Sequence, residues 1–499
     1  MSAGYVAIDL GAESGRAIVG VLADGRITLA EVHRFPHEIV RLPSGLHWDV
    51  TGLWREICCG LKKSAQWAQA NNVRLESVGV DAWGVDWALL DKSGELVGLP
   101  HAYRDPRNRA AYDRVVAQLG VDAIYRTTGI QLMAINSLYS FFAHWTDSRQ
   151  ACEAAEQLLF IPDLFHYWLS GKAVIEATIA STSQMVDCQT RHWATKLLEP
   201  LGLPTNLLGS ILPPGTTVGP LRSEIAAETG LPVDLKVVAP GSHDTASAIA
   251  AVPAETGSNW CYLSSGTWSL LGAELDEPCV SADAQAAMFT NEYGVGDKIR
   301  FLKNITGLWL VQECRRDLQR QGQTFDYAEL TQRASKAEGF RTLIDPAYPT
   351  FQTPGDMLQK IRQFAVDTDQ PLPETPGQFI RCSLESLALV YRHTVDRLEA
   401  VLDRSFSVLH IVGGGGQNQL LNQMTADATG KTVCVGPYEA TAVGNTLTQA
   451  LAAGHVASLD ELRGIVANSF NLATYAPVAS DPWQTAYLRY KGLVDRSSN

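Results

Sequence analysis

The chain has 499 residues, 46% hydrophobic and 19% charged, a length and balance that predict two globular domains of roughly 200–250 residues each. Its formal net charge at pH 7 is −13. Because nucleic acid is bound chiefly by lysine and arginine side chains that neutralise phosphates, we expect no nucleic-acid partner. No apolar run approaches the roughly 18–20 residues that a membrane-spanning helix needs, so we expect no membrane partner either.

The cysteines and the opening residues predict a compartment. There are nine cysteines, and none of them forms a Cys-x-x-Cys pair. An odd number without metal-ligand spacing favours reduced, mostly buried thiols over disulfides or a metal centre. The opening, MSAGYVAIDLG, enters a strand pattern at once and lacks the charged leader and apolar stretch of a signal peptide. We therefore expect a cytoplasmic protein.

Two segments of the chain open in the same way. From Tyr5 the pattern is a strand, a Gly/Ser turn, a second strand, an Asp24–Gly25 hairpin and a third strand. From Trp260 it is again a strand, a Ser/Gly turn and a strand. Further along, residues 137–145 and 384–402 show helical periodicity, and residues 78–81 and 408–412 are typical of short buried strands.

These elements predict two α/β domains of related topology, with functional residues at the ends of their strands. The segment AVPAETGS, residues 251–258, is the best boundary because Pro and Gly interrupt a helical run there. The predicted domains are residues 1–250 and 251–499. Two unrelated α/β domains are the alternative.

The first turn, residues 9–16 (DLGAESGR), has the composition of a phosphate-binding loop. The carboxylate of Asp9 at a strand end can hold a hydrated Mg²⁺ ion. Glycines let backbone N–H groups approach phosphate oxygens, and Ser14 and Arg16 add donors. An ordinary hairpin turn is the alternative.

The second opening and a later glycine run suggest further ligand contacts. Residues 264–269, SSGTWS, have the donors of a second phosphate loop, although hydroxyl-rich turns are also common in purely structural positions. Residues 413–416 are four consecutive glycines, against which a flat adenine could lie, and Asn418 could bind its edge or the ribose. A plain strand-to-helix turn is the alternative, but it needs only one or two glycines.

Asp244 is the candidate for proton transfer. It follows Gly241, Ser242 and His243 and precedes a run of small helical residues. A carboxylate there could accept the proton of an alcohol that attacks a γ-phosphoryl group, or it could simply favour the helix dipole. We interpret His243 as an orienting or packing residue.

Aromatic and polar residues that could contact a sugar occur in two segments. The segment 79–90 contains Trp83, Gly84 and Asp86, and the segment 103–107 adds aromatic and charged side chains. Residues 302–312 could either contact the sugar or pack in a core. Within the first segment, Trp87 and the two leucines at 89–90 are more typical of a core.

Eight motifs follow one another along nearly the whole chain and resemble those of the FGGY carbohydrate kinases in order and approximate spacing. They are IDLGAESGR, VDAWGVD, YRDPRNR, SHDTASA, YLSSGTWSLLG, LKNITGLWLVQE, HIVGGGGQN and EATAVGN. The segments GIQLMAINSLY and LKNITGLWL resemble members of the family that act on L-rhamnulose.

The resemblance implies two actin-like, ribonuclease-H-like domains with a nucleotide and sugar cleft between them. The N-terminal domain would bind the sugar and carry the phosphate loop and the catalytic aspartate, and the C-terminal domain would bind the nucleotide. ATP would be the co-substrate, together with Mg²⁺.

The resemblance also implies site residues. Asp244 would be the catalytic base, and Asp9 would hold the metal through water. The nucleotide-binding residues would be Ala12, Glu13, Ser14, Gly15, Arg16, Thr267, Gln312 and Gly414. The sugar-binding residues would be Gly84, His243, Asp244, Thr245 and Asn304. Glu13 departs from the wider family, which often has a small or hydroxyl residue there.

The activity implied is transfer of the ATP γ-phosphoryl group to the C1 hydroxyl of L-rhamnulose in L-rhamnose degradation, giving L-rhamnulose 1-phosphate and ADP. A kinase of L-fuculose or of another deoxyketose is the alternative, since these sugars differ in hydroxyl stereochemistry. A more remote alternative is an actin-like ATPase module whose ATP turnover would not depend on a sugar.

Overall fold

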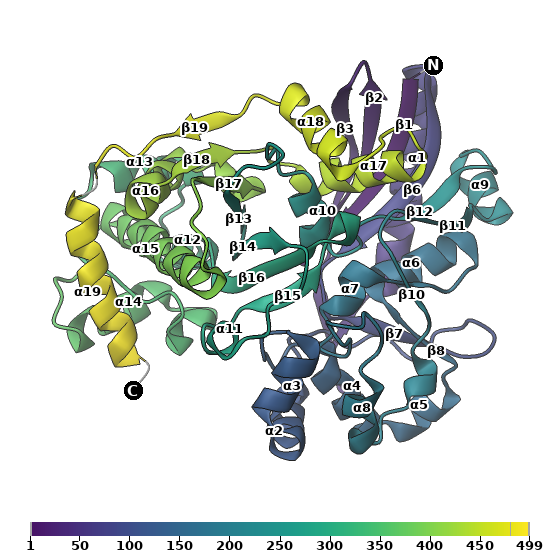
Figure 1. Cartoon of the computed structure of the whole chain (residues 1–499), viewed down its shortest axis with the longest axis horizontal. Coiled ribbons are helices and arrows are strands. Elements are labelled where there is room, and N and C mark those ends of the chain that lie inside the picture. Colours follow the sequence, from purple (N-terminus) through teal and green to yellow (C-terminus); the bar gives the residue numbers. More distant parts are fainter. Residues whose placement is uncertain (1, 480, 498–499) are drawn as a thin grey trace. The chain divides into compact units, whose positions relative to one another are not determined.

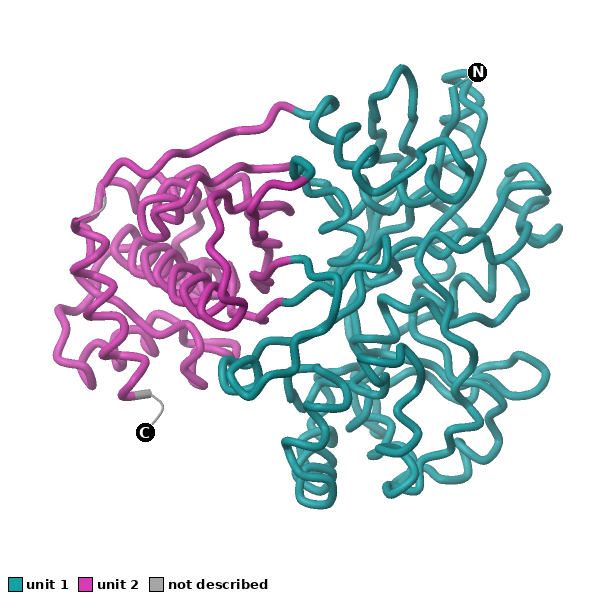
Figure 2. Tube along the Cα trace, in the orientation of Figure 1, with its two compact units in different colours: residues 1–256, 274–301, 439–470 teal, residues 257–273, 302–438, 471–499 magenta. Residues whose placement is uncertain are grey.

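The computed structural model describes residues 2–479 and 481–497 and confirms the predicted α/β class. Two compact units divide the chain (Figures 1 and 2). Unit 1 comprises the residues up to Thr256, together with Glu274–Phe301 and Glu439–Phe470. Unit 2 comprises Gly257–Ala273, Leu302–Tyr438 and the residues from Asn471 onward. Within the described ranges, no helix has the length and apolar character needed to cross a membrane.

Unit 1 is built on a six-stranded sheet with the order β11-β12-β6-β1-β2-β3. Its strands are β1 (Ser2–Leu10), β2 (Ser14–Ala23), β3 (Arg26–Pro36), β6 (Val73–Ala82), β11 (Thr216–Pro220) and β12 (Lys236–Ala239). Strand β1 pairs antiparallel with β2 and parallel with β6, and β2 pairs antiparallel with β3. The predicted opening of three strands is confirmed, as is the predicted strand at residues 78–81, which lies within β6.

Alternating side chains of β1 face opposite sides of this sheet, and helices cover both sides. Val6 and Ile8 belong to the large core of unit 1, to which helix α1 (Val50–Ala70) contributes Leu53 and Ile57. Ala7, between them in sequence, packs with Ala442 of α17 (Ala440–Ala452) on the other side. A helix from late in the chain thus packs on the sheet that the first residues of the chain form.

Helix α17 approaches its neighbours closely. A Cβ atom on Gly444 would lie 1.8 Å from the carbonyl oxygen of Ser247 in α10 (Asp244–Ala250), so only glycine fits at this crossing. Gln449 of α17 donates a hydrogen bond of 3.0 Å to the carbonyl oxygen of Val6. The helix is therefore held against the sheet by polar bonds as well as by apolar contact.

Unit 1 also contains further helices and strands. The helix predicted at residues 137–145 is confirmed as α4. The helices are α2 (Arg107–Leu119), α3 (Val121–Thr128), α4 (Ser137–Asp147), α5 (Arg149–Ala154), α6 (Ile161–Ser170), α7 (Ala177–Ser181), α8 (Thr195–Leu198), α9 (Ser223–Thr229), α11 (Ala282–Ala286) and α18 (Leu459–Ser469). The further strands are β4 (Ile39–Leu42), β5 (Gly45–Trp48), β7 (Trp87–Leu90), β8 (Gln157–Phe160), β9 (Ile175–Glu176), β10 (Ile211–Leu212) and β15 (Thr290–Tyr293). Of these, β15 is the edge strand of the second large sheet.

Unit 2 contributes β16, β14, β13, β17, β18 and β19, in this order, to the second large sheet. Their bounds are β13 (Trp260–Ser265), β14 (Trp268–Leu275), β16 (Ile299–Thr306), β17 (Val408–Val412), β18 (Thr432–Val435) and β19 (Ala473–Tyr475). Strand β13 pairs antiparallel with β14 and parallel with β17, and β17 pairs parallel with β18, which pairs antiparallel with β19. The strands β2, β1, β6, β12 and β11 have the same sequence of orientations, which confirms the predicted related topology.

The helices of unit 2 confirm one predicted helix and extend it. They are α12 (Trp309–Arg320), α13 (Tyr327–Lys336), α14 (Met357–Asp367), α15 (Pro376–Leu402), α16 (Gln419–Thr429) and α19 (Asp481–Ser497). The helix predicted at residues 384–402 begins earlier because Thr375 and Gln378 form a reciprocal capping box around Pro376, the first helical residue. The predicted strand at 408–412 is β17.

The chain first passes between the units at Thr256 and Gly257, inside the segment 251–258 where the sequence predicts a boundary. The division into residues 1–250 and 251–499 stays a prediction, because the units are defined by compactness in space and the predicted domains by sequence. None of the nine cysteines is paired, and six of them are buried.

We expect Gly444→Ala to destabilise the protein by about 1–3 kcal/mol, because its methyl group would overlap the backbone of α10. Gly464→Ala is the matched control, since Gly464 also lies inside a helix, α18, but its added methyl group would meet nothing within 4 Å. That change should stabilise the protein by about 0.5–1 kcal/mol. Urea unfolding of both variants measures the difference, and equal stabilities would contradict this close packing.

Candidate functional site

Two buried carboxylates lie side by side at the carboxyl ends of two central strands of the unit 1 sheet. Asp9 of β1 and Asp81 of β6 are register partners on parallel strands, and their exposed fractions are 4% and 0%. Arg16, opposite Asp9 on β2, forms ion pairs with Asp9 and with Glu439 at the start of α17. Asn445 of α17 donates a hydrogen bond of 2.5 Å to Oδ2 of Asp81. Each carboxylate thus has one fixed partner.

The electrostatics of this pair leave room for a cation. Burial raises the pKa of Asp9, Arg16 opposes this, and the nearby carboxylate of Asp244 raises it further. Burial raises the pKa of Asp81 well above its ordinary value, and Asp9 and Asp244 add to the effect, whereas the bond from Asn445 opposes it. Oδ1 of Asp81 is buried and has no hydrogen-bond partner among the residues that the structure describes. A divalent cation or its water shell would satisfy that atom.

Asp244 is brought to the same strand ends by a backbone connection. The N–H of Ala82, at the end of β6, donates a hydrogen bond of 2.9 Å to the carbonyl oxygen of Ser242. Asp244 follows as the first residue of α10, and its side chain is 30% exposed, more than those of the two buried aspartates. Thr245 donates a hydrogen bond of 3.0 Å to Oδ1 of Asp244. This carboxylate is therefore partly accessible from outside the protein.

His243 is oriented from behind by a buried ion pair. Its Nδ1 lies 3.2 Å from Oε2 of Glu292, and Arg300, which is fully buried, lies 2.9 Å from the same oxygen. Although burial alone would raise the pKa of Glu292, Arg300 and His243 hold it below its ordinary value. Nε2 of His243 lies 3.5 Å from Oδ1 of Asp244. The interpretation of His243 as an orienting or packing residue stays a prediction.

A further buried carboxylate, Glu176, holds the loop before Asp244. It is fully buried, and burial raises its pKa to about 7. It accepts hydrogen bonds from the backbone N–H groups of Thr178 at 2.8 Å and of Ser242 at 3.1 Å. The hydroxyl of Thr178 donates to Glu176 at 2.6 Å and accepts the N–H of His243 at 3.1 Å. Two residues of the loop are thereby fixed.

Gly84 leaves space next to His243. A Cβ atom at this position would lie 3.3 Å from Nε2 of His243 and 3.2 Å from Cγ2 of Thr182. The next residue, Val85, has a φ of 71°, which is strained for a β-branched residue and places this turn in an unusual conformation. Backbone strain of this kind is typical of functional sites.

Asp86 and Trp83 are two of the residues suggested as sugar contacts, and their polar atoms form hydrogen bonds within the protein. Asp86 is 2% exposed and accepts hydrogen bonds from the indole N–H groups of Trp48 at 2.6 Å and Trp83 at 2.9 Å. Burial raises the pKa of Asp86 to about 7. The core role expected for Trp87 is confirmed.

The turn after β1 is held in place by His37. Its backbone N–H donates to the carbonyl oxygen of Glu13 at 3.2 Å, and its Nε2 donates to that of Gly11 at 2.6 Å. Gly15 is required for packing, because a Cβ atom there would lie 2.2 Å from the ring of Phe35. Glu13 is exposed, Gly15 is buried, and the other predicted nucleotide-binding residues of this turn are half-buried, namely Ala12, Ser14 and Arg16.

In unit 2 the structure brings Thr267 and Gln312 together. Nε2 of Gln312 in α12 donates a hydrogen bond of 3.1 Å to the hydroxyl of Thr267. The carbonyl oxygen of Thr267 accepts the N–H of Gly307 at 3.1 Å, which fixes the turn against the start of α12. Oε1 of Gln312 is buried without a hydrogen-bond partner in the described part of the chain.

Of the four glycines after β17, only Gly414 lies in open space. A Cβ atom there would meet nothing within 4 Å, whereas one on Gly415 would lie 2.1 Å from Oγ of Ser265. The packing of the protein therefore does not require glycine at 414, and an external flat group remains a reason for it. Oδ1 of Asn418 accepts the N–H of Leu421 at 3.0 Å and caps α16, so this oxygen is not free for a nucleotide.

The predicted sugar-binding residues fall in both units. Gly84, His243, Asp244 and Thr245 lie in unit 1, and Asn304 lies on β16 in unit 2. Their roles, like those of the nucleotide-binding residues, stay predictions. Sequence reasoning missed the residues that hold this site from behind. Of these, Asp81 lies in the motif VDAWGVD, and Glu439 and Asn445 lie in EATAVGN. The other missed residues are Glu176, Glu292 and Arg300.

Comparison with known proteins places these features in a family. Residues 4–251 match the model of the N-terminal domain of the FGGY family of carbohydrate kinases, and residues 261–453 match the model of its C-terminal domain. A rhamnulokinase of Bacteroides thetaiotaomicron is 42% identical over 99% of this chain and 100% of the relative. A rhamnulokinase of Enterococcus faecalis is 39% identical over 99% of this chain and 98% of the relative.

A solved structure shares the fold at low sequence identity. Ligand-bound xylulose kinase from Lactobacillus acidophilus superposes with a TM-score of 0.84 at 15% identity, covering 99% of this chain and 98% of that chain. The predicted fold class is thereby confirmed. With family models matching both of its parts and near full-length relatives, the chain belongs to the FGGY family of carbohydrate kinases.

Proposed function

We propose that this carbohydrate kinase transfers the γ-phosphoryl group of ATP to the C1 hydroxyl of L-rhamnulose, giving L-rhamnulose 1-phosphate and ADP. The observation that carries the proposal is the partly exposed Asp244 beside the buried pair Asp9 and Asp81, in a chain whose near full-length relatives are rhamnulokinases. We further propose that it acts in the cytoplasm, which nine unpaired cysteines support.

Asp244 acts as the base in this proposal. In phosphoryl transfer to an alcohol, a carboxylate positions the attacking hydroxyl and takes its proton as the new bond forms. Thr245 fixes Oδ1 by donating a hydrogen bond to it, and the remaining lone pairs of the carboxylate are then available to the attacking hydroxyl. The proton moves from the C1 hydroxyl to the carboxylate, and the leaving phosphate of ADP keeps the electrons of the broken bond.

The sugar is held by the groups around Asp244. The contact with Glu292 holds the imidazole of His243, and Glu176 and Thr178 hold the loop by accepting the backbone N–H groups of Ser242 and His243, before the ligand arrives. Gly84 provides the space in which sugar hydroxyls can reach Nε2 of His243. Together with Thr245 and Asn304, these groups form a set of polar contacts that discriminates between hydroxyl configurations.

The nucleotide is bound by residues of both units in this proposal. The turn 12–16 supplies backbone and side-chain donors to the phosphates, and the hydroxyl of Thr267, fixed by Gln312, supplies a further donor. Gly414 gives an open surface for the adenine. Excluding water around the γ-phosphoryl group would favour transfer to the sugar over hydrolysis.

The residues present also fit Mg²⁺. Asp9 and Asp81 would hold it, and the unbonded Oδ1 of Asp81 offers a ligand or an acceptor for its water. Because Mg²⁺ usually keeps several of its waters, we expect these carboxylates to hold it partly through water. When bound, Mg²⁺ would neutralise charge on the transferring phosphates.

A ketose panel tests the proposed substrate. Product formation with ATP should be fastest, as kcat/KM, for L-rhamnulose, lower for L-fuculose, and absent for 1-deoxy-L-rhamnulose, which lacks the accepting hydroxyl. Phosphorus NMR of the products identifies the phosphorylated carbon. A higher kcat/KM for L-fuculose would favour the alternative deoxyketose, and sugar-independent ADP release would contradict a kinase.

We expect Asp244→Asn to lower kcat by about 10²-fold or more, the scale associated with a positioned base. The asparagine oxygen can still accept the bond from Thr245, so nucleotide affinity should stay close to that of the parent protein. Asp276→Asn is the control, because Asp276 is 86% exposed in a surface pair with Lys298 and should keep the parent kcat. A near-parental kcat for Asp244→Asn would remove Asp244 from the mechanism.

A further inference from the structure

Three potential metal ligands meet between β3 and α1, apart from the site described above. Nε2 of His33 on β3 lies 2.8 Å from Oε2 of Glu56 on α1, and Cys59 follows one helical turn after Glu56. The ligand atoms of the three side chains all lie within 4.8 Å of one another. None of the three takes part in the proposed transfer to the sugar.

The fold aims His33 at the helix. The register between β2 and β3 shifts at Val32, so that His33, rather than Val32, lies opposite Ala17. A Cβ atom on Gly60 of α1 would lie 2.6 Å from Cβ of Ala17 and 3.6 Å from the ring of His33. The bulge and the glycine thus place the imidazole against α1, where residues three apart share a face. Bulges that re-aim a side chain are typical of functional positions.

The donor set has the chemistry of a zinc site. Imidazole nitrogen, carboxylate oxygen and thiolate sulfur are the three ligand types of Zn²⁺, at bond lengths of about 2.0–2.3 Å. Tetrahedral binding at these lengths needs ligand atoms about 3.3–3.6 Å apart, which small side-chain rotations can reach from the present separations. The exposed fractions of the His33 and Glu56 side chains are 10% and 28%, so an ion can enter.

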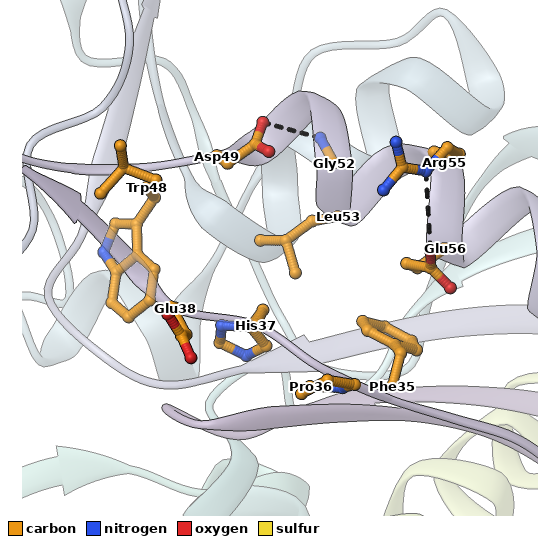
Figure 3. A pocket seen from close by; sticks show the side chains of 11 residues that line it. Phe35, Pro36, His37, Glu38, Trp48, Asp49, Gly52, Leu53, Arg55 and Glu56 are labelled. Atoms are coloured by element: carbon orange, nitrogen blue, oxygen red, sulfur yellow. Dashed lines mark hydrogen bonds and ion pairs between the residues drawn. The ribbon is translucent and has the colours of Figure 1, made fainter.

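Glu56 also borders a hollow from which a fourth ligand can come. Figure 3 shows Glu56 and Arg55 on the helix facing Phe35 and Pro36 on the strand side of this hollow, whose volume is about 310 Å³. Nε of Arg55 lies 3.6 Å from Oε1 of Glu56, which leaves Oε2 toward His33. Water in the hollow can complete the coordination.

The charged amino group of Lys63 lies next to His33 and would weaken the binding of a metal ion there. Its Nζ lies 2.9 Å from Nδ1 of His33, so in the metal-free protein Nδ1 accepts from Lys63 and Nε2–H donates to Glu56. An ion at Nε2 requires the imidazole proton on Nδ1, and Lys63 must then swing away. Its exposed position on α1 permits this movement.

We propose that His33, Glu56 and Cys59 bind one Zn²⁺ ion, with water as the fourth ligand, and so tie β3 to α1. Binding converts the thiol of Cys59 to a thiolate and releases its proton to solvent, without any change of oxidation state.

Titration of the metal-free, reduced full-length protein without nucleotide tests this site. Co²⁺ is the spectroscopic probe, and Zn²⁺ affinity is measured by competition with a chromophoric chelator. We expect one equivalent of Co²⁺ to produce a thiolate-to-cobalt charge-transfer band. Cys59→Ser should abolish the band and weaken Zn²⁺ binding by at least about tenfold, and His33→Gln should weaken it similarly. Lys63→Met should tighten binding because a competing charge is removed.

Cys58→Ser is the matched control. Cys58 is the preceding residue of α1, but it is 8% exposed, and burial raises the pKa of its thiol to about 12. This variant should keep the band and the Zn²⁺ affinity. Cys59→Ser should keep the kinase rate with Mg²⁺, which shows that it is folded. Absence of the band in the parent protein, or equal losses in Cys58→Ser and Cys59→Ser, would overturn the proposal.

Discussion

The burial of Asp9 and Asp81 side by side is the constraint on which the rest of unit 1 depends. Burial raises the pKa of both carboxylates, and the charge of Asp9 raises the pKa of Asp81 further. Arg16 pairs with Asp9, and Asn445 donates a hydrogen bond to Asp81. Asp81 keeps one oxygen without a donor among the described residues. A protein that keeps such a pair gives up stability for a site that attracts positive charge.

This arrangement explains why a helix from late in the chain packs on the first sheet. Glu439 and Asn445, at the start of and within α17, supply the second partner of Arg16 and the donor to Asp81. Gly444 lets the same helix lie against α10, whose first residue is Asp244. The proposed base and the proposed cation ligands are therefore positioned by one helix crossing, and residues 1–250 cannot form this arrangement alone.

The sequence predicts the strands and the turn at Asp9 well, because hairpin residues and alternating side chains are local signals. It also places Asp244 in the first turn of a helix, as the structure does, whereas the role of this carboxylate stays a prediction. The sequence places Asp81 correctly at the end of a buried strand but does not identify it as part of the site. Nothing local shows that a parallel strand brings another carboxylate beside it. Longer-range pairs leave no local signal either, and Asp86 looked like a sugar contact although two indoles occupy it. The remaining long-range partners are Glu176, Glu292 and Arg300.

In the proposed mechanism Asp81 binds the cation and Asp244 accepts the proton. Mn²⁺ binding to the ADP complex, followed by electron paramagnetic resonance, separates the two roles. Asp81→Asn should raise the Kd for Mn²⁺ by at least about tenfold, as loss of a charged ligand does. Asp244→Asn should change it by less than about threefold, because that carboxylate is partly exposed and its proposed role is toward the sugar. Equal changes in the two variants, or none in Asp81→Asn, would contradict the account.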